Sequence, residues 1–262
     1  MKFACTYSNR YGIGDTTFLD EKWAQGFRAI EIATSALPEE YDEQRRIISY
    51  AKELGFSVNL HAPYGKNNIS SNDTSRRLSS IANTKHAIDL AHELSLGTVC
   101  FHPGRRSDDI ETDEENFPTL YEAVREIVEY AKEKQVRVAL ENMERRPYEY
   151  IMTVQDLNRF APLAKDNVYF GVTVDFCHYS SHTPGEVPLG ELLLPLYDVH
   201  VSQNFEGKMH RGLECEGAVS PVSVLTQLKA VSYDGFITLE VLEHGESLAA
   251  MNEALDTLSA AI

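Results

Sequence analysis

Short apolar runs alternate along this chain with longer segments of helical period. The runs predict strands near residues 3–7, 28–33, 56–61, 97–102, 136–141, 168–175, 197–201 and 235–240. The segments between them predict helices near residues 16–26, 39–54, 73–95, 116–134, 153–161, 186–194, 220–231 and 246–260. Regular alternation of this kind is typical of βα units arranged around a parallel sheet.

Eight strands with eight helices are the count of a (β/α)8 TIM barrel, a closed α/β fold. The length of 262 residues suits one such barrel as well as two smaller domains. No linker or low-complexity segment divides the sequence, so we predict a single domain over residues 1–262. The alternative is an open doubly wound sheet, but no G-x-G-x-x-G motif follows the first predicted strand.

Several predicted strands end in residues that bind metals or transfer protons. Glu141, Asp175, His200 and Glu240 close the fifth to eighth strands, and the chemistry of a (β/α)8 barrel lies at these carboxyl ends. For any one of these residues alone, a salt bridge or a loop cap is the favoured explanation. Together, three carboxylates and one imidazole favour a site for one divalent ion such as Mn²⁺, Mg²⁺, Co²⁺ or Zn²⁺. Without a cation the clustered carboxylates would repel one another.

Other histidines lie near the same predicted face. His61 and His102 close the third and fourth strands, where either imidazole could bind another metal or donate a hydrogen bond to a substrate. A core histidine with ordinary partners is the alternative for each. His178 follows Asp175 by three residues, and we prefer a role in binding substrate or supporting a ligand over a surface position. Four more histidines are predicted to be ordinary surface residues: His86, His92, His182 and His244.

The charge of the chain limits its partners. A formal net charge of −16 argues against a protein whose main task is binding nucleic acid. Two arginine doublets nevertheless follow the fourth and fifth strands, and they supply Arg105 and Arg145, with Arg211 on another loop of the same face. Because guanidinium groups bind phosphate and carboxylate in a bidentate manner, these arginines favour an anionic substrate. The alternative is that they pair with nearby acids, which are Asp108, Asp109, Glu144 and Glu149.

The remaining composition indicates a cytoplasmic protein. No stretch approaches the roughly 20 apolar residues of a membrane span, and the start of the chain shows no secretory signal. The four cysteines are scattered without a C-x-x-C pair, and Cys5, Cys100 and Cys177 lie in apolar runs typical of buried reduced thiols. The oligomeric state stays open, with a homo-oligomer as one alternative.

Taken in order, H-A-P-Y, F-H-P-G, L-E-N, D-x-x-H and the final L-E resemble the xylose isomerase-like barrel superfamily, from about residue 3 to 258. This superfamily contains sugar isomerases and epimerases and the endonuclease IV group, which cuts DNA at abasic sites. In the isomerase and epimerase branch, the residues matching Glu141, Asp175, His200 and Glu240 bind one metal. The two glutamates also act as the acid/base pair, and the residue matching His178 contacts the substrate.

The resemblance therefore implies a metal-dependent isomerase or epimerase of a sugar or sugar phosphate, which works by proton abstraction next to a carbonyl. Glu141 and Glu240 would face opposite sides of the carbon chain, and one would remove a proton that either returns. Epimerisation needs a base on each face, whereas aldose–ketose isomerisation could use one. The sequence leaves both open.

The alternative is an endonuclease IV-like zinc phosphodiesterase acting on abasic DNA. In that branch three Zn²⁺ ions are held by residues that match His61, His102, Glu141, Asp175, His178, His200, His210 and Glu240. One further ligand, the aspartate of a D-x-H pair, is replaced here by Lys208, whose ammonium group would repel a zinc ion. A metal-bound ligand sensor on the same barrel is a third alternative, although the sequence shows no DNA-binding helix or partner domain.

Overall fold

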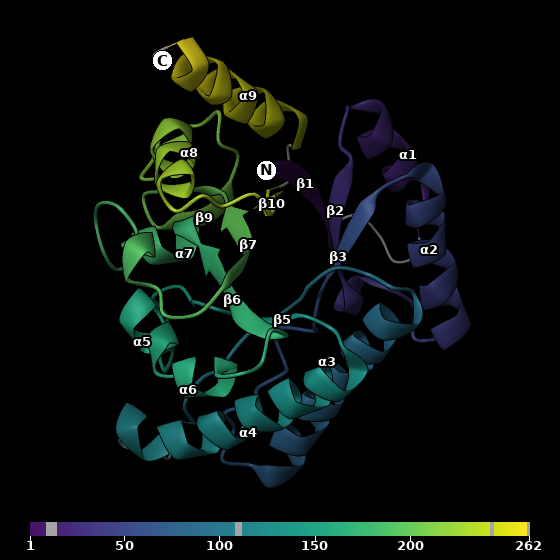
Figure 1. The fold of residues 1–262 in the computed structure, drawn as a ribbon, viewed down its shortest axis with the longest axis vertical. Helices are drawn as coiled ribbons and strands as arrows, with labels where there is room; N and C mark the ends of the chain where they lie inside the picture. Colours follow the sequence, from purple (N-terminus) through teal and green to yellow (C-terminus); the bar gives the residue numbers. More distant parts are fainter. Residues whose placement is uncertain (9–14, 108–111, 242–243, 261–262) are drawn as a thin grey trace.

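The computed structural model describes residues 1–8, 15–107, 112–241 and 244–260. Within these residues, eight parallel strands form a closed barrel in the order β1-β10-β7-β6-β5-β4-β3-β2 (Figure 1). The strands are β1 (Lys2–Tyr7), β2 (Ala29–Ala33), β3 (Ser57–His61), β4 (Val99–Phe101), β5 (Val138–Glu141), β6 (Phe170–Asp175), β7 (Leu196–Val201) and β10 (Phe236–Leu239). Each lies within two residues of a predicted strand, so the predicted (β/α)8 barrel is confirmed.

Helices surround the barrel on its outer side (Figure 1). They are α1 (Thr17–Ala24), α2 (Tyr41–Leu54), α3 (Thr74–Glu93), α4 (Asp113–Lys134), α5 (Val154–Asn158), α6 (Ala161–Ala164), α7 (Phe176–Ser180), α8 (Pro221–Ala230) and α9 (His244–Ala260). The side chains of Asp73 and Thr153 cap α3 and α5, since each accepts a hydrogen bond from a backbone amide in the first turn. Gly55 ends α2 in the left-handed conformation, with φ 103°.

The predicted helix over 186–194 is wrong. The segment contains only a short 3-10 turn, η3 (Leu189–Glu191), and a second such turn, η2 (Thr34–Ala36), follows β2. Pro188 and Pro195 bracket the apolar run, and it is too short to build a stable helix between them. Leu189 and Leu194 of this segment are buried, whereas Leu193 is exposed. The helix between β6 and β7 is α7, directly after Asp175.

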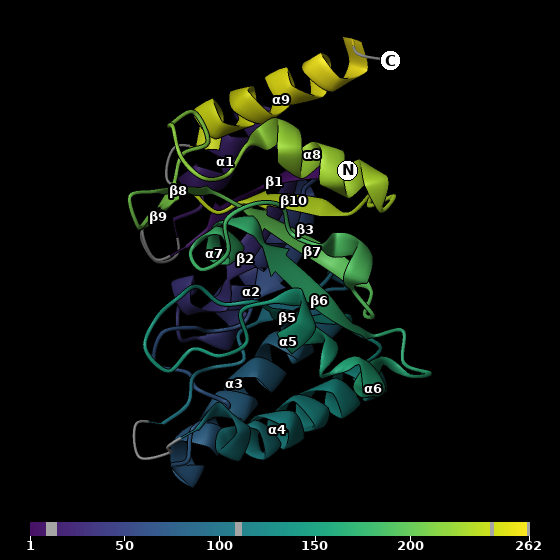
Figure 2. The same cartoon turned by 90° about the vertical axis from the view of Figure 1, so that its left-hand side faces the viewer.

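A hairpin that the sequence did not predict follows β7. Its strands are β8 (Gln203–Phe205) and β9 (Lys208–Arg211), which pair antiparallel. Glu206 and Gly207 connect them, with φ 51° and 76°, as a two-residue hairpin turn requires. The hairpin lies at the edge of the molecule close to α7 (Figure 2), and it carries Lys208 and His210 towards the open end of β7.

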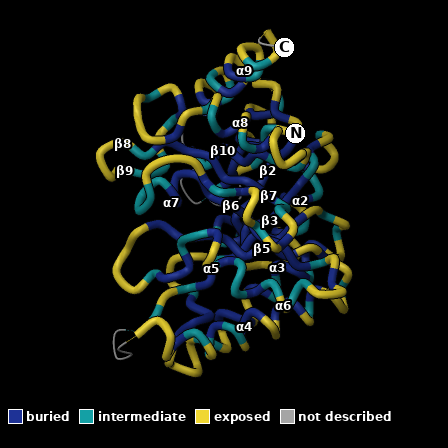
Figure 3. Tube along the Cα trace, turned by 60° about the vertical axis from the view of Figure 1, so that its left-hand side comes forward, coloured by how far each residue is buried: buried dark blue, intermediate teal, exposed yellow. Residues whose placement is uncertain are grey.

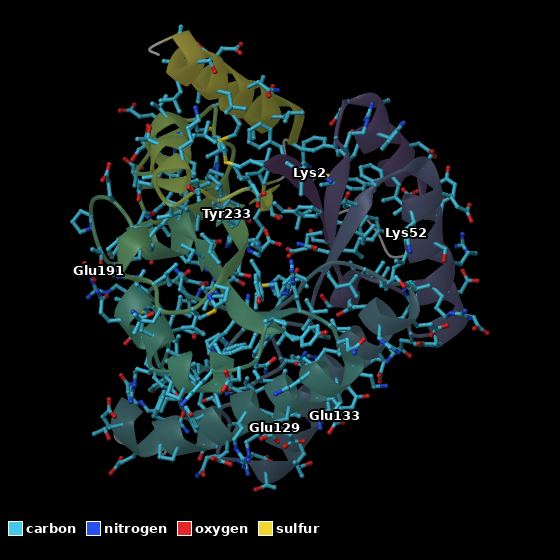
Figure 4. The ribbon with its side chains drawn as sticks, viewed as in Figure 1. Lys2, Lys52, Glu129, Glu133, Glu191 and Tyr233 are labelled. Carbon is cyan, nitrogen blue, oxygen red and sulfur yellow. The ribbon has the colours of Figure 1, made fainter. Side chains whose placement is uncertain are left out.

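The strands form the buried centre of the molecule, and the exposed residues lie on the outer helices and loops (Figure 3). Glu129 and Glu133, for example, are exposed on the outer face of α4 (Figure 4). The three cysteines of the apolar runs are buried free thiols, as predicted. His244 corrects the expected surface position, because it is 1% exposed and its Nε2 accepts a hydrogen bond from the Thr6 amide at 3.1 Å. No helix of the described residues has the length and apolar character needed to cross a membrane.

Candidate metal centre and cavity

Four predicted ligands meet inside one end of the barrel. Glu141 and Asp175 are the last residues of β5 and β6, His200 lies in β7, and Glu240 directly follows β10. The strand register places Asp175 beside His200. One donor atom from each of the four residues lies within 4.8 Å of the others. A single cation could therefore contact all four side chains.

Glu141 is the most heavily contacted of the four. Its Oε2 lies 2.9 Å from His102 Nε2 and 3.3 Å from His61 Nε2, while its Oε1 lies 3.2 Å from His200 Nδ1. Burial would raise the pKa of Glu141, but the charges of His200 and His102 hold this pKa well below its usual range. In return, the pKa of His200 lies well above its usual value: burial lowers it, but nearby carboxylates outweigh that effect. The imidazole of His200 and the carboxylate of Glu141 thus stabilise each other's charged forms.

Asp175 provides a test of whether the site fits a metal ion. Its Oδ1 accepts a hydrogen bond from the amide of His178 at 2.7 Å, but its Oδ2 is buried and has no hydrogen-bond partner among the described residues. Burial raises the pKa of this carboxyl to about 6, and the charges of Glu240 and Glu141 add to the effect. A buried carboxylate oxygen without a partner is costly, and a cation would satisfy it. Three oxygen donors and one nitrogen donor suit a hard or borderline divalent ion.

Two further groups of donor atoms adjoin these four. His61, His102 and Glu141 form one, and Asp175, His178, His210 and Glu240 form the other; each group also lies within 4.8 Å. The structure therefore brings together all eight residues that the sequence predicted as ligands or possible additional ligands.

Hydrogen bonds orient two of the outer histidines. His61 Nδ1 lies 2.7 Å from the carbonyl oxygen of Ala62, and His178 Nδ1 lies 2.9 Å from that of Asn142. Since a carbonyl oxygen only accepts, Nδ1 carries a proton in both rings. Nε2 of His61 lies 3.3 Å from Glu141 Oε2, and Nε2 of His178 lies 3.3 Å from Glu144 Oε2. His210, on β9, places Nδ1 3.2 Å from Glu240 Oε2. Burial would raise the pKa of Glu240, but His210 holds it below its usual range.

A cavity of about 250 Å³ adjoins the four central ligands through Glu240. Its other lining residues include His61, His102, His178, His210, Tyr64, Arg105, Arg146 and Glu149. Its volume equals the liquid volume of roughly eight water molecules. The space suits a small organic molecule held over the carboxylates.

Four arginines of this face, Arg105, Arg145, Arg146 and Arg211, are exposed, but only two of them line the cavity. Arg105 lines the cavity, as does Arg146, which pairs with Glu144. Arg145 and Arg211 are exposed and are not among the described residues that line the cavity. Two of the acids proposed as arginine partners, Asp108 and Asp109, lie outside the described residues.

The loop that carries Arg105 is held in place by one carboxamide. Asn68 Oδ1 accepts a hydrogen bond from the amide of Arg105 at 3.0 Å, and Asn68 Nδ2 donates to the carbonyl of Arg105 at 2.8 Å. Gly104 makes this approach possible, since its φ is +73° and a Cβ there would lie 2.2 Å from Asn68 Oδ1. Arg105 is thus presented to the cavity from a fixed backbone.

Three buried acids contact or adjoin the site in ways that the sequence did not predict, although Glu144 was named as a possible partner of the arginines. Glu31 and Asp198 are 0% exposed inside the barrel, and Glu31 Oε2 lies 3.2 Å from His200 Nε2. Glu144 is 3% exposed, with Oε2 3.3 Å from His178 Nε2. The available signal for Glu31 was a carboxylate within the otherwise apolar strand A-I-E-I-A. A buried charge of this kind needs a partner.

Comparisons with known proteins agree with this architecture. Residues 23–261 match the family described as xylose isomerase-like TIM barrel. An uncharacterized protein of Methanocaldococcus jannaschii is 28% identical over 213 residues, which are 74% of this chain and 68% of that protein.

Solved structures show the same fold at lower sequence identity. A D-tagatose 3-epimerase-like protein has a TM-score of 0.87 at 22% identity, with 99% of both chains covered. D-psicose 3-epimerase from Clostridium cellulolyticum H10, solved with D-tagatose, has a TM-score of 0.75 at 19% identity, with 98% of both chains covered. With the family match spanning most of its length, the chain belongs to the xylose isomerase-like TIM barrel family.

Proposed function

We propose that this protein is a divalent-metal-dependent isomerase or epimerase of a sugar or sugar phosphate, which works by proton abstraction next to a carbonyl. The observation that carries the proposal is the convergence of Glu141, Asp175, His200 and Glu240 within 4.8 Å below a small cavity. The similarity to a D-tagatose 3-epimerase-like protein and to a D-psicose 3-epimerase supports the same chemistry. Localisation in the cytoplasm and a homo-oligomeric state stay predictions.

In this proposal the four central residues hold the ion, which when bound polarises a carbonyl and stabilises negative charge that develops beside it. Glu240 lines the cavity and is 24% exposed at its side chain, whereas the side chain of Glu141 is 1% exposed beneath the imidazoles. Glu240 would exchange a proton with the substrate carbon on the open side, and Glu141 would do so from below. His61, His102 and His178 would bind substrate oxygens, and His61 and His178 would donate from Nε2 when the ring is protonated, which their raised pKa values favour.

The cavity also favours an anionic group at the far end of the substrate. Arg105, whose backbone is held by Asn68, lines the cavity, and so does Arg146. Guanidinium groups bind carboxylate and phosphate well. Arg145 and Arg211, which the sequence also predicted to bind substrate, would act only if a larger substrate extends beyond the cavity.

The proposal is tested by screening sugars and sugar phosphates in deuterated water with Mn²⁺, Mg²⁺, Co²⁺ or Zn²⁺. Deuterium incorporation detected by mass spectrometry would report proton abstraction even when the product is unknown. Glu240→Gln and Glu141→Gln should each slow exchange by roughly 10² to 10⁴-fold. Glu53→Gln, at an exposed position of α2, is the matched control and should exchange as the wild type does. Exchange that survives in both active-site variants would refute the assignment.

A zinc phosphodiesterase acting on abasic DNA is the second candidate. The two additional groups of donor atoms favour it, because a one-metal epimerase does not need them as ligands. The net charge and Lys208, on the exposed side of β9, oppose it. Metal analysis separates the two candidates: one ion per chain supports the isomerase, and two or three Zn²⁺ ions with cleavage of an abasic duplex support the phosphodiesterase.

A further inference from the structure

Glu31 is a buried carboxylate that the proposed chemistry does not use. It lies in the middle of β2 and is 0% exposed. Its Oε2 lies 3.2 Å from His200 Nε2, and its Oε1 has no hydrogen-bond partner among the described residues. A carboxylate in this environment costs folding free energy unless an interaction compensates it. The contact with His200 is therefore the feature to explain.

The ring of His200 has different hydrogen-bond partners from the rings of His61 and His178. His61 and His178 each direct Nδ1 to a backbone carbonyl. In His200, Nδ1 has no carbonyl partner among the described residues and lies 3.2 Å from Glu141 Oε1 and 4.0 Å from Glu240 Oε2, while Nε2 faces Glu31. Nδ1 of His178 also lies 3.4 Å from Glu141 Oε1, but its hydrogen is donated to the Asn142 carbonyl. A neutral imidazole that donates its Nε2 hydrogen has its lone pair on Nδ1.

We propose that Glu31 is a positioning residue, which accepts the Nε2 hydrogen of His200 and thereby aims the Nδ1 lone pair at the metal site. The inference rests on the proposed function, because it assumes that a divalent ion binds beside Nδ1. Carboxylates in this outer position typically change metal affinity by 10 to 100-fold when they are removed. Glu31 then has a function without touching ion or substrate.

A competing reading places a second ion deeper in the barrel. Donor atoms of Glu31, Cys100 and His200 also lie within 4.8 Å of one another. However, the Cys100 thiol donates to Glu141 Oε2 at 3.3 Å, and burial together with the charges of Glu141 and Glu31 raises its pKa well above the usual value. A protonated thiol is a poor metal ligand, so the hydrogen-bond role is favoured.

Asp198 supplies a matched control for the loss of a buried carboxylate. It is also 0% exposed, and it lies on the same strand as His200. Its Oδ2 accepts from Asn59 Nδ2 at 2.6 Å and its Oδ1 from Thr238 Oγ1 at 3.1 Å. Asp198→Asn therefore removes a carboxylate at similar depth without removing the contact to Nε2 of His200.

The test measures Mn²⁺ affinity by titration calorimetry in the full-length protein. Glu31→Ala should bind Mn²⁺ roughly 10 to 100-fold more weakly than the wild type. Glu31→Gln should recover most of this loss, since its carbonyl oxygen still accepts the Nε2 hydrogen, and Asp198→Asn should bind much as the wild type does. In the Zn²⁺-loaded protein, ¹⁵N NMR should show His200 protonated at Nε2, and Glu31→Ala should weaken or lose this signal.

Three results would overturn the inference. Equal Mn²⁺ affinity in wild type and Glu31→Ala, with the His200 signal unchanged, would show that Glu31 does not position the ring. Two ions per chain, with one lost in both Glu31→Ala and Cys100→Ser, would establish the deeper metal site instead. If the wild type binds no divalent ion, the proposed function and the inference are both wrong. In the other two results the wild type still binds an ion, so only the inference fails.

Discussion

Glu149 should make the free energy of unfolding fall as the pH rises, and the substitution Glu149→Gln should remove this dependence. Its side chain lines the cavity, and its Oε2 is buried without a hydrogen-bond partner among the described residues. Burial raises the pKa of Glu149 from the ordinary 4.5 to about 7, the charge of Glu144 adds to this, and Arg105 and Arg146 oppose it. The folded protein therefore holds a proton on Glu149 more tightly than the unfolded chain does.

The sign and size of the effect follow from proton linkage. Between about pH 4.5 and 7 the folded state binds more protons than the unfolded state, so the free energy of unfolding falls as the pH rises. One pKa unit corresponds to about 1.4 kcal/mol. The pKa difference at Glu149 then costs about 1 kcal/mol near pH 5 and about 3 kcal/mol near pH 8. Glu149→Gln is neutral at every pH and should not show this decline.

The assay is urea unfolding of the wild type and Glu149→Gln at several values between about pH 5 and pH 8. The stability difference should grow in favour of Glu149→Gln by about 2 to 3 kcal/mol over this range. Glu53→Gln, which removes an exposed carboxylate of α2, should track the wild type. A difference between Glu149→Gln and wild type that is constant with pH would refute the reasoning.

Three other perturbations test the site. Gly104→Ala places a methyl group against Asn68 at a φ of +73°, and it should lower the free energy of unfolding by about 1 to 3 kcal/mol. Because Asn68 holds the backbone of Arg105, the substitution should also weaken binding of an anionic substrate more than binding of its neutral counterpart. Lys208→Asp supplies a carboxylate two residues before His210, and metal analysis should show one additional Zn²⁺ per chain if the neighbouring donors form a second site. Removal of divalent ions with a chelator should abolish solvent-proton exchange into the substrate. It should also lower the melting temperature, because an ion that binds only the folded state stabilises it. Unchanged exchange after verified metal removal would exclude a role for the ion.

The strand ends were the part of the molecule that could be predicted. Buried parallel strands combine a distinctive composition with a fixed direction, so polar residues at their carboxyl ends were expected to converge. Glu141, Asp175, His200 and Glu240 do converge. The same argument could not place Arg105 and Arg145, because loop conformation decides which arginine lines the cavity, and the Asn68 carboxamide that fixes Arg105 comes from a different loop.

Residues whose role depends on a distant partner were missed. Glu31 contacts His200 across the barrel, and nothing in the local pattern of β2 reveals that partner. His244 was expected on the surface because it lies away from the ends of the predicted strands, yet the packing of α9 buries it beside Phe18 and Phe27. The hairpin of β8 and β9 also escaped prediction, since its strands contain three and four residues and have no clear alternation.

The pairing of β1 with β10 has a consequence for how the site is assembled during synthesis. Lys2 to Cys5 pair with Phe236 to Leu239, so the sheet closes only when the last strand emerges from the ribosome. Glu240 follows that strand directly, which leaves a nascent chain with three of the four central donors. A cation would then bind tightly only when the barrel closes. The concentration of free metal ions would therefore affect newly made molecules at the step in which β10 joins the sheet.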